Sequence, residues 1–237
     1  INGAACSYAT IGAAISAASD GDTIYIPSGN TYNEQLGSIS KDLTLVAALA
    51  DCSGPDPAAT SSSVTIDGGG ASGGTWGGIA DVTLNTAVTF THIRLYDANA
   101  LYGGILYVDQ GATVVLDESE VEQGSAANFG GGVRVYIGGK LLTNGSYIHR
   151  NQVTSGDGGG VAAYQGAVTM TASSNVGLGN GGNTASDQGG GLYLESSTLY
   201  MDDSQVLANS ATNEGGGVYG FGTSVVNLHG FARIGGF

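Results

Sequence analysis

The sequence predicts an all-β fold: a right-handed parallel β-helix, that is, a solenoid of about eight coils, with a short N-terminal capping helix. Three observations predict it. Glycine runs recur at a long and nearly fixed spacing, apolar residues alternate with a period of two between the runs, and each spacing holds short apolar segments separated by Gly, Asn, Ser or Asp. Such a pattern indicates stacked strands rather than helices.

The glycine runs set the length of the repeat. The first aliphatic residues after the runs are 26, 28, 28, 31 and 26 residues apart: Ile79, Ile105, Val133, Val161, Leu192 and Val218. A fixed period of about 20–50 residues is typical of repeat arrays. Equivalent residues of stacked coils lie above one another, so a corner that needs a positive φ needs it in every coil. We therefore expect the glycines to form such corners.

The segments between the runs are expected to be strands. Val133, Val135 and Ile137 alternate with other residues before a Gly138-Gly139 turn. Strands this short can form one triangular coil, stacked on its neighbour at about 4.8 Å. A β-propeller blade needs about 40–50 residues, which is too long for this repeat. A leucine-rich repeat needs a leucine and asparagine pattern that is absent here.

The first residues differ from the repeats. We expect 1–22 to form a cap and 23–237 to form the β-helix. A weakly amphipathic helix, started by Ser7 or Thr10 and ended at Asp20-Gly21, fits the cap. The residues on its apolar face are Tyr8, Ile11, Ala14, Ile15 and Ala18. Such a helix would cover the open end of the first coil, whereas 228–237 contain no comparable segment and predict an uncapped end.

The overall composition excludes several partners. Six Lys and Arg against twenty Asp and Glu give a net charge of −14. Nucleic acid is therefore not an expected partner, because binding to phosphates needs clustered cations. No apolar run reaches the length of about 18 residues that a membrane helix needs, so membrane insertion is not expected either. The acidic balance suits an extracellular protein, with Ca²⁺ as a conceivable ligand and no other cofactor.

Two stretches resemble known β-helix proteins. TIGAAISAASDGDTIYIPSGNTYNE (10–34) resembles the opening of pectin-lyase-like parallel β-helix proteins. The GGGV and GGGL units resemble the Gly-Gly-Ala-Ile repeats of chlamydial-type polymorphic outer membrane proteins. The accompanying Phe-x-x-Asn element keeps only its Asn, in IHRN (148–151) and VLAN (206–209). These resemblances imply a secreted or surface-displayed β-helix.

Cys6 and Cys52 are the only cysteines. A disulfide between them would close a loop worth roughly 4 kcal/mol in the chain-entropy model, if the geometry allows it. Two buried free thiols are the alternative. The sequence begins without an initiator Met or a signal peptide, which indicates processing or excision. We expect a structural disulfide and an extracellular or cell-surface location.

The densest acidic segment is LDESEVEQ (116–123), in which Glu118, Glu120 and Glu122 are expected to project outward from one strand. Counting back 26 residues places Arg94 beside Glu120 on the adjacent coil. The simplest interpretation is a cross-coil ion pair worth about 0.2–1 kcal/mol. The functional interpretation is a patch that binds Ca²⁺ or a glycan.

Four tyrosines follow the glycine runs at positions that should point outward: Tyr136, Tyr164, Tyr193 and Tyr219. Exposed aromatic side chains can bind sugar rings through their apolar faces. Packing across the outside of the sheet is the alternative explanation. These tyrosines are the candidate glycan contacts.

No catalytic residues are predicted. Asp202, Asp203, His229 and Arg233 superficially resemble a polygalacturonase site, but the Asn-Thr-Asp element of that family is missing. A lyase of this fold needs facing basic residues, and the six cations here are scattered. We expect a non-catalytic stalk, adhesin-like passenger or assembly subunit, with glycans or proteins of a cell surface or matrix as partners. Head-to-tail self-association through the uncapped end is a further hypothesis. A polysaccharide-binding module, a polysaccharide lyase or a glycoside hydrolase is the alternative.

Overall fold

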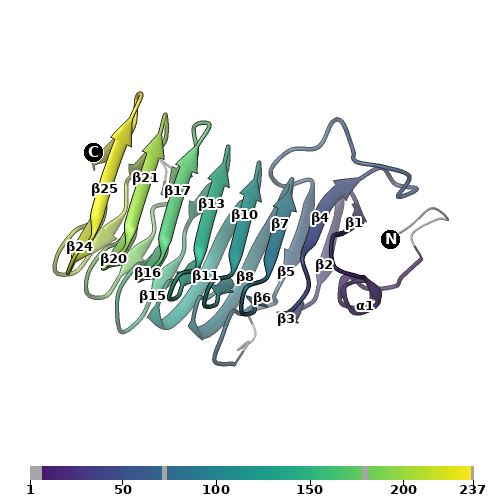
Figure 1. Cartoon of the computed structure of the whole chain (residues 1–237), viewed down its shortest axis with the longest axis horizontal. Coiled ribbons are helices and arrows are strands. Elements are labelled where there is room, and N and C mark those ends of the chain that lie inside the picture. The colour runs from purple at the N-terminus through teal and green to yellow at the C-terminus, as the bar shows by residue number, and fades with distance from the viewer. Residues whose placement is uncertain (1–6, 71–73, 178–180, 236–237) are drawn as a thin grey trace.

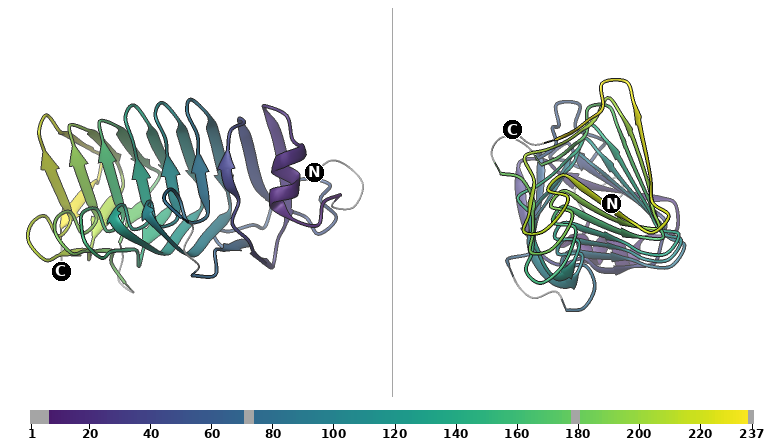
Figure 2. Two further views of the ribbon diagram at one scale, coloured as in Figure 1. Left: turned by 90° about the horizontal axis from the view of Figure 1, so that it is seen from below. Right: turned by 90° about the vertical axis from the view of Figure 1, so that its left-hand side faces the viewer.

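The chain folds into coils stacked along one axis, with a single short helix at the N-terminal end (Figure 1). The structure is a computed structural model that describes residues 7–70, 74–177 and 181–235. Seen along the axis, the coils superimpose around a common interior (Figure 2). Each coil passes in turn through three parallel sheets, so the predicted fold class is confirmed.

The first sheet has eight parallel strands: β1 (Asp22–Pro27), β4 (Leu43–Ala48), β7 (Ala87–Thr91), β10 (Thr113–Asp117), β13 (Lys140–Asn144), β17 (Ala167–Thr171), β21 (Thr198–Asp202) and β25 (Val225–His229). The third sheet has seven: β3 (Gly37–Ile39), β6 (Ala80–Val82), β9 (Leu106–Val108), β12 (Val133–Val135), β16 (Val161–Tyr164), β20 (Leu192–Glu195) and β24 (Val218–Phe221).

The second sheet has more strands than the other two, because several of its later coils contribute two short strands each. Its main path is β2 (Asn30–Asn33), β5 (Val64–Asp67), β8 (Ile93–Tyr102), β11 (Glu120–Phe129), β14 (Tyr147–His149), β18 (Asn175–Val176), β22 (Gln205–Leu207) and β26 (Arg233–Gly235). Three further strands extend it beside β11: β15 (Gln152–Val153), β19 (Thr184–Ala185) and β23 (Ser210–Ala211). Since the third sheet has seven strands, seven described coils are complete and the predicted number of about eight is slightly high.

Inward-facing aliphatic side chains form the core. In the first sheet Val114 pairs with Val88 on one side and with Leu141 on the other, and all three side chains are buried. Each such side chain contributes roughly 1.5–3 kcal/mol through burial. No coil could bury this surface alone, because its inward residues contact mainly the coils above and below.

The helix α1 (Ile11–Ala17) covers the N-terminal end of the stack (Figure 1). Thr10 is the N-cap and accepts a hydrogen bond from the Ala13 amide at 3.1 Å. The Glu34 carboxylate accepts hydrogen bonds from the amides of Ile11 (2.9 Å) and Gly12 (3.0 Å). Glu34 ends the stretch that resembles pectin-lyase-like proteins, and it acts here as a second cap for the helix.

The first glycine of each run is a left-handed corner. The six residues at this position have φ between +50° and +73°: Gly77, Gly103, Gly130, Gly158, Gly189 and Gly215. A side chain there would be strained in every coil. The second glycine is required by close approach, since a Cβ on Gly159 would meet the carbonyl oxygen of Gly190 in the next coil. The glycine runs are therefore tight corners, as predicted.

The third glycine makes room for an internal ladder of asparagines. A Cβ on Gly160 would lie 2.9 Å from Nδ2 of Asn183, and one on Gly132 would lie equally close to Nδ2 of Asn151. Asn151 donates to Oδ1 of Asn183 at 2.9 Å, and Asn183 donates to Oδ1 of Asn209 at 2.9 Å. The side chains of Asn151 and Asn183 are buried, and both also donate to backbone carbonyls.

The alignment that the sequence predicted between Ile105 and Val133 is wrong by one residue. Val133 pairs with Leu106, and Ile105 occupies the place of the third glycine. The reason is the volume of the interior: the residue that aligns with Asn151 in this earlier coil is Gly124, at which a Cβ would meet the side chain of Ile105 at 2.6 Å. The pair of Ile105 and Gly124 thus fills the space that Gly132 and Asn151 fill in the following coil.

Several predictions concern the two ends of the chain. Cys52 is buried, and Cys6 lies outside the described residues, so the disulfide stays a prediction. Val226 and Leu228 of β25 are exposed, because no described residue packs beyond this coil. None of the helical segments in the described ranges has the length and apolarity that crossing a bilayer requires.

Replacing Gly159 with alanine should destabilise the protein by about 1–3 kcal/mol, because the new methyl group overpacks the corner against backbone atoms. This glycine has no positive φ, so the substitution tests close approach alone. Gly220→Ala is the control, since its Cβ would meet only Ser224 at an ordinary 3.6 Å. Urea unfolding followed by circular dichroism measures both variants. Equal midpoints for the two would contradict the close-approach argument.

Replacing Asn183 with alanine should cost about 2–4 kcal/mol, because it removes the side-chain oxygen that accepts from the buried backbone and side-chain amides of Asn151. Asn175→Ala is the matched control from the same coil, since among the described residues the Asn175 side chain is bonded only to the exposed carbonyl of Ser173. Thermal unfolding monitored by calorimetry compares the two variants. A similar shift in both melting temperatures would show that the ladder adds no stability.

Candidate functional site

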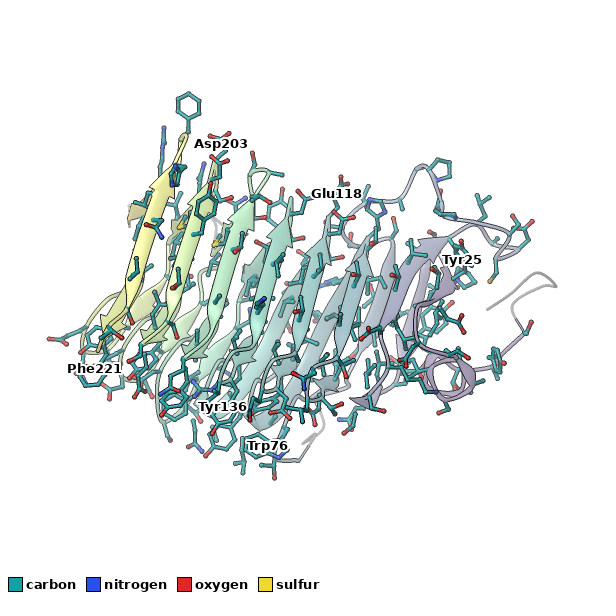
Figure 3. All side chains as sticks on the ribbon, viewed as in Figure 1. Tyr25, Trp76, Glu118, Tyr136, Asp203 and Phe221 are labelled. Atoms are coloured by element: carbon teal, nitrogen blue, oxygen red, sulfur yellow. The ribbon has the colours of Figure 1, made fainter. Side chains whose placement is uncertain are left out.

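Eight of the eighteen aromatic residues gather along the outer surface of the third sheet and the corners that lead into it. Figure 3 shows Trp76 and Tyr136 at one edge of the stack, with Glu118 at the opposite edge. The parallel register of β9, β12, β16, β20 and β24 aligns outward residues of successive coils in rows. We call this surface the aromatic face and define it by Trp76, Tyr102, Tyr107, Phe129, Tyr136, Tyr164, Tyr193 and Tyr219.

The rings of the aromatic face contact one another along the axis of the stack. Trp76 lies at its N-terminal end, with its ring centroid 4.9 Å from that of Tyr102 and 4.7 Å from that of Tyr107. Phe129 continues the row from Tyr102 at 6.2 Å. The contacts leave one side of Trp76 open, and 45% of its surface is exposed.

The structure places the four predicted tyrosines on this face, in two separate stacks. Tyr136 and Tyr164 stack at a centroid distance of 5.7 Å, and so do Tyr193 and Tyr219. Phe129 connects the second of these stacks to Tyr102, with its centroid 6.2 Å from that of Tyr193, whereas Tyr107 connects to the first, 6.2 Å from Tyr136. Whether the tyrosines contact a glycan stays a prediction.

Sequence reasoning missed half of the aromatic face. Trp76, Tyr102 and Phe129 each come directly before the left-handed glycine of their coil, and Tyr107 follows its glycine run. The signal becomes visible only when the first glycine is used to align the repeats. The isolated bridge between Trp76 and Tyr102 and the ladder pair of Phe129 and Tyr102 confirm this alignment.

A cleft of about 350 Å³ opens among these rings. Its lining is almost entirely aromatic, with one cation and one carboxylate among the rings: Trp76, Tyr102, Tyr107, Phe129, Arg134, Tyr136, Tyr164 and Glu195. An apolar concave surface with few polar groups is the usual form of a ligand site. The cleft lies across several coils, since its residues come from β8, β9, β11, β12, β16 and β20 or the corners beside them.

Arg134 lies in the middle of this cleft. Its side chain is packed under the rings, and only 7% of the residue surface is exposed. The guanidinium carbon lies 4.8 Å from the ring centroid of Phe129 and 5.8 Å from that of Tyr164. Among the described residues, the Nη1 atom has no hydrogen-bond partner and Arg134 forms no ion pair.

Burial changes the titration of the groups around the cleft. It lowers the pKa of the Arg134 guanidinium below its usual value, although Tyr107 and Glu195 act in the opposite direction. Burial also raises the pKa of Tyr107 above its usual range and that of Tyr193 to about 12. Tyr107 and Tyr193 are therefore neutral at physiological pH and offer apolar rings and hydroxyl groups, not charge.

The three acidic candidates behave differently from one another. Glu118 precedes β11, at a left-handed corner with φ of +44°, so the prediction that all three lie on one strand is wrong for it. Glu120 pairs with Arg94 in the ladder, as the count of 26 residues predicted, with Nε and Oε2 3.6 Å apart. Glu122 is not an exposed group, because only 2% of its side chain is accessible.

Glu122 is buried because two arginines enclose it. Arg94 on the preceding coil donates to its Oε2 from Nε at 2.7 Å, and Arg150 on the following coil donates to its Oε1 at 2.6 Å. Burial raises the pKa of Glu122, but the hydrogen bonds from both arginines outweigh it and hold that pKa below the usual value. Glu122, Arg94 and Arg150 together form an ion-pair network across three coils.

The same network contains the one set of side chains in the described residues that could hold a metal ion. One ligand atom each of Glu120, Glu122 and His149 lie within 4.8 Å of one another. His149 Nε2 is 2.6 Å from Oε1 of Glu120, and both oxygens of Glu122 are bonded to arginines. A cation would have to displace these bonds, so the arrangement fits a structural ion-pair network better than a Ca²⁺ site.

The fold and the cleft define a right-handed parallel β-helix with a solvent-facing aromatic site. Residues 77–230 match the family model described as a right handed beta helix region, and the chain belongs to this family. The expected pectin-lyase-like right-handed β-helix is thereby confirmed. The resemblance of the glycine repeats to chlamydial-type proteins stays a prediction.

Two similar solved structures are of one enzyme, the pectin methylesterase from Aspergillus niger, in two states of deglycosylation. The deglycosylated form is 14% identical with a TM-score of 0.46, and the match covers 97% of this chain and 82% of that one. The penultimately deglycosylated form is also 14% identical, with a TM-score of 0.43 and coverage of 94% and 82%. No curated protein sequence matches the chain.

Replacing Glu122 with glutamine should destabilise the protein by about 2 kcal/mol at pH 7, because two arginines lose a charged acceptor. The pKa of Glu122 is lower in the folded than in the unfolded chain. Its contribution is therefore complete above the unfolded pKa and is lost as the pH falls through the folded one. The difference between wild type and variant should shrink below about pH 4.

The control for this substitution is Glu118→Gln, which removes an exposed carboxylate paired with His92 at 3.0 Å. Its expected cost is below about 1 kcal/mol, as for other surface pairs. Urea unfolding at several pH values between 3 and 8 measures both variants. A pH-independent loss in Glu122→Gln would contradict the ion-pair explanation.

Proposed function

We propose that this chain is a glycan-binding β-helix of an extracellular or cell-surface protein, and that the aromatic face is its binding surface. A carbohydrate chain would lie along the axis of the stack, with sugar rings packed on the faces of Trp76, Tyr102 and Tyr136. Binding needs no catalytic group, so the proposal is compatible with the expected stalk or adhesin-like role. The proposal also agrees with the alternative that the sequence left open, a polysaccharide-binding module.

The observation that carries this proposal is the cleft itself. Aromatic rings bind sugars through their apolar faces, and hydroxyl groups of tyrosines can donate or accept hydrogen bonds at the same time. Rings from successive coils lie side by side along the stack, with centroids 4.7 Å apart at the closest pair and 6.2 Å at the widest, so they offer an extended surface to a chain of sugars. The exposed side of Trp76 is the part of this surface that packing within the protein does not use.

Packing alone is the competing explanation of the aromatic face. It accounts for the buried ring of Tyr193, which contacts Phe129 and Tyr219. It does not account for an exposed tryptophan at the end of a row, because an exposed ring contributes little to stability. Contacts that only stabilise the fold do not require a cleft between the rings.

Replacing Trp76 with alanine should weaken glycan binding by about 5–50-fold, since it removes a stacking surface worth roughly 1–2 kcal/mol. The substitution also removes the ring contacts with Tyr102 and Tyr107, so circular dichroism checks that the variant is folded at the temperature of the titration. Affinity electrophoresis in gels that contain single polysaccharides identifies the ligand, and calorimetric titration with an oligosaccharide of that polymer measures the affinity.

Tyr147→Ala is the matched control, because Tyr147 is an exposed aromatic residue on the second sheet, away from the cleft. It should bind as the wild type does. If no neutral or acidic polysaccharide retards the wild-type protein, or if both variants bind equally well, the aromatic face is not a glycan site.

A further inference from the structure

We propose that the ligand of the aromatic face carries an acidic group, a carboxylate or sulfate ester on a sugar, and that Arg134 binds this group. The inference rests on the proposed glycan-binding function and names the class of glycan. Arg134 is a cation in the lining of an aromatic cleft, and no anion of the described residues forms an ion pair with it.

Arg134 differs from the other arginines that the structure pairs. Arg94 and Arg150 are more exposed, with 27% and 40% of their side chains accessible, and both nevertheless form ion pairs with Glu122. Arg134 is nine-tenths buried and forms none in the described part of the chain. A buried cation without an anionic partner is costly, and a buried donor without an acceptor adds to the cost.

The residues around Arg134 do not compensate for this cost. In the ladder its neighbours are Tyr107 on one side and Ala162 on the other, and neither carries a charge at physiological pH. The rings of Phe129 and Tyr164 offer cation–π contacts, which stabilise the guanidinium but leave Nη1 without an acceptor. The carboxylates of Glu195, in the cleft lining, and of Asp157 act on Arg134 only through space, since neither forms an ion pair with it in the described residues.

The chemistry of the missing partner follows from these contacts. A guanidinium presents a planar fork of donors, which matches the oxygens of a carboxylate or a sulfate ester. The surrounding rings match the apolar face of the sugar that carries the acidic group. A charge-assisted hydrogen bond in a cleft shielded from water is stronger than one at the surface.

The charge of the whole protein restricts the ligand further. A net charge of −14 repels a long polyanion, and this repulsion is strongest at low ionic strength. One buried arginine attracts only at short range. The site therefore fits one acidic sugar at a fixed place among aromatic contacts, in contrast to a basic groove that follows a chain of charges.

The experiment uses pairs of ligands that differ only in charge. Hexagalacturonate and its fully methyl-esterified form share one chain, and cellohexaose with and without a 6-sulfate forms the second pair. Calorimetric titrations should show the wild-type protein binding one acidic member about 10–100-fold more tightly than its neutral partner. The pair with the larger ratio distinguishes a carboxylate from a sulfate ester.

Arg134→Met should abolish this discrimination, so that the variant binds the acidic and the neutral member of the pair with affinities within about threefold of each other. Its melting temperature should stay equal or rise, because an unpaired buried cation is replaced by an apolar side chain. Arg94→Met is the matched control. It should keep the discrimination and lower the melting temperature, because it breaks the bonds to Glu122.

Each result has a defined consequence. Equal binding of the acidic and neutral members by wild type overturns the inference and leaves the proposed glycan binding intact. Failure of every oligosaccharide and polysaccharide to bind contradicts both. Unchanged discrimination in Arg134→Met would assign the selectivity to another residue. The wild-type comparison needs no variant, so it stands even if Arg134→Met does not fold.

Discussion

The parallel ladder between coils is the interaction on which the rest of the structure depends. It fixes the distance between neighbouring coils and aligns equivalent residues, so each corner must repeat the conformation of the one before it. At the corner before the third sheet, the backbone of one coil approaches the next so closely that Gly159 and Gly190 have no room for a side chain. The glycine runs follow from this approach.

The same alignment produces the candidate site. Residues that follow the glycine corner occupy equivalent places on the third sheet, so aromatic residues scattered over more than a hundred positions of the chain become one surface. Arg134 is buried because rings from its own and adjacent coils enclose it. On the second sheet, the same alignment encloses Glu122 between two arginines, where each charge finds its partner.

The repeat period was enough to predict the fold class, the glycine corners and the pairing of Arg94 with Glu120. These features depend only on the spacing between coils. The register at Ile105 and the asparagine ladder were not predicted, because they depend on how side chains share the interior. Asn183 in particular lies in a coil in which the usual spacing is not kept, since the count from Asn151 is 32 residues. The burial of Arg134 could not be predicted either, since no feature near it in the sequence marks it.

The solenoid contains two kinds of coil. In one kind an isoleucine at the corner packs against a glycine, as Ile105 does against Gly124; in the other a glycine packs against an asparagine, as Gly160 does against Asn183. In the first kind the corner is filled by an aliphatic side chain. In the second kind it is filled by asparagine side chains that are hydrogen-bonded from one coil to the next. Recombination that duplicates or deletes a unit within one kind preserves this continuity. A coil moved across the boundary at Gly124 would place isoleucine against asparagine, which overfills the corner, or glycine against glycine, which leaves a gap. The array can therefore lengthen freely only among coils of the same kind.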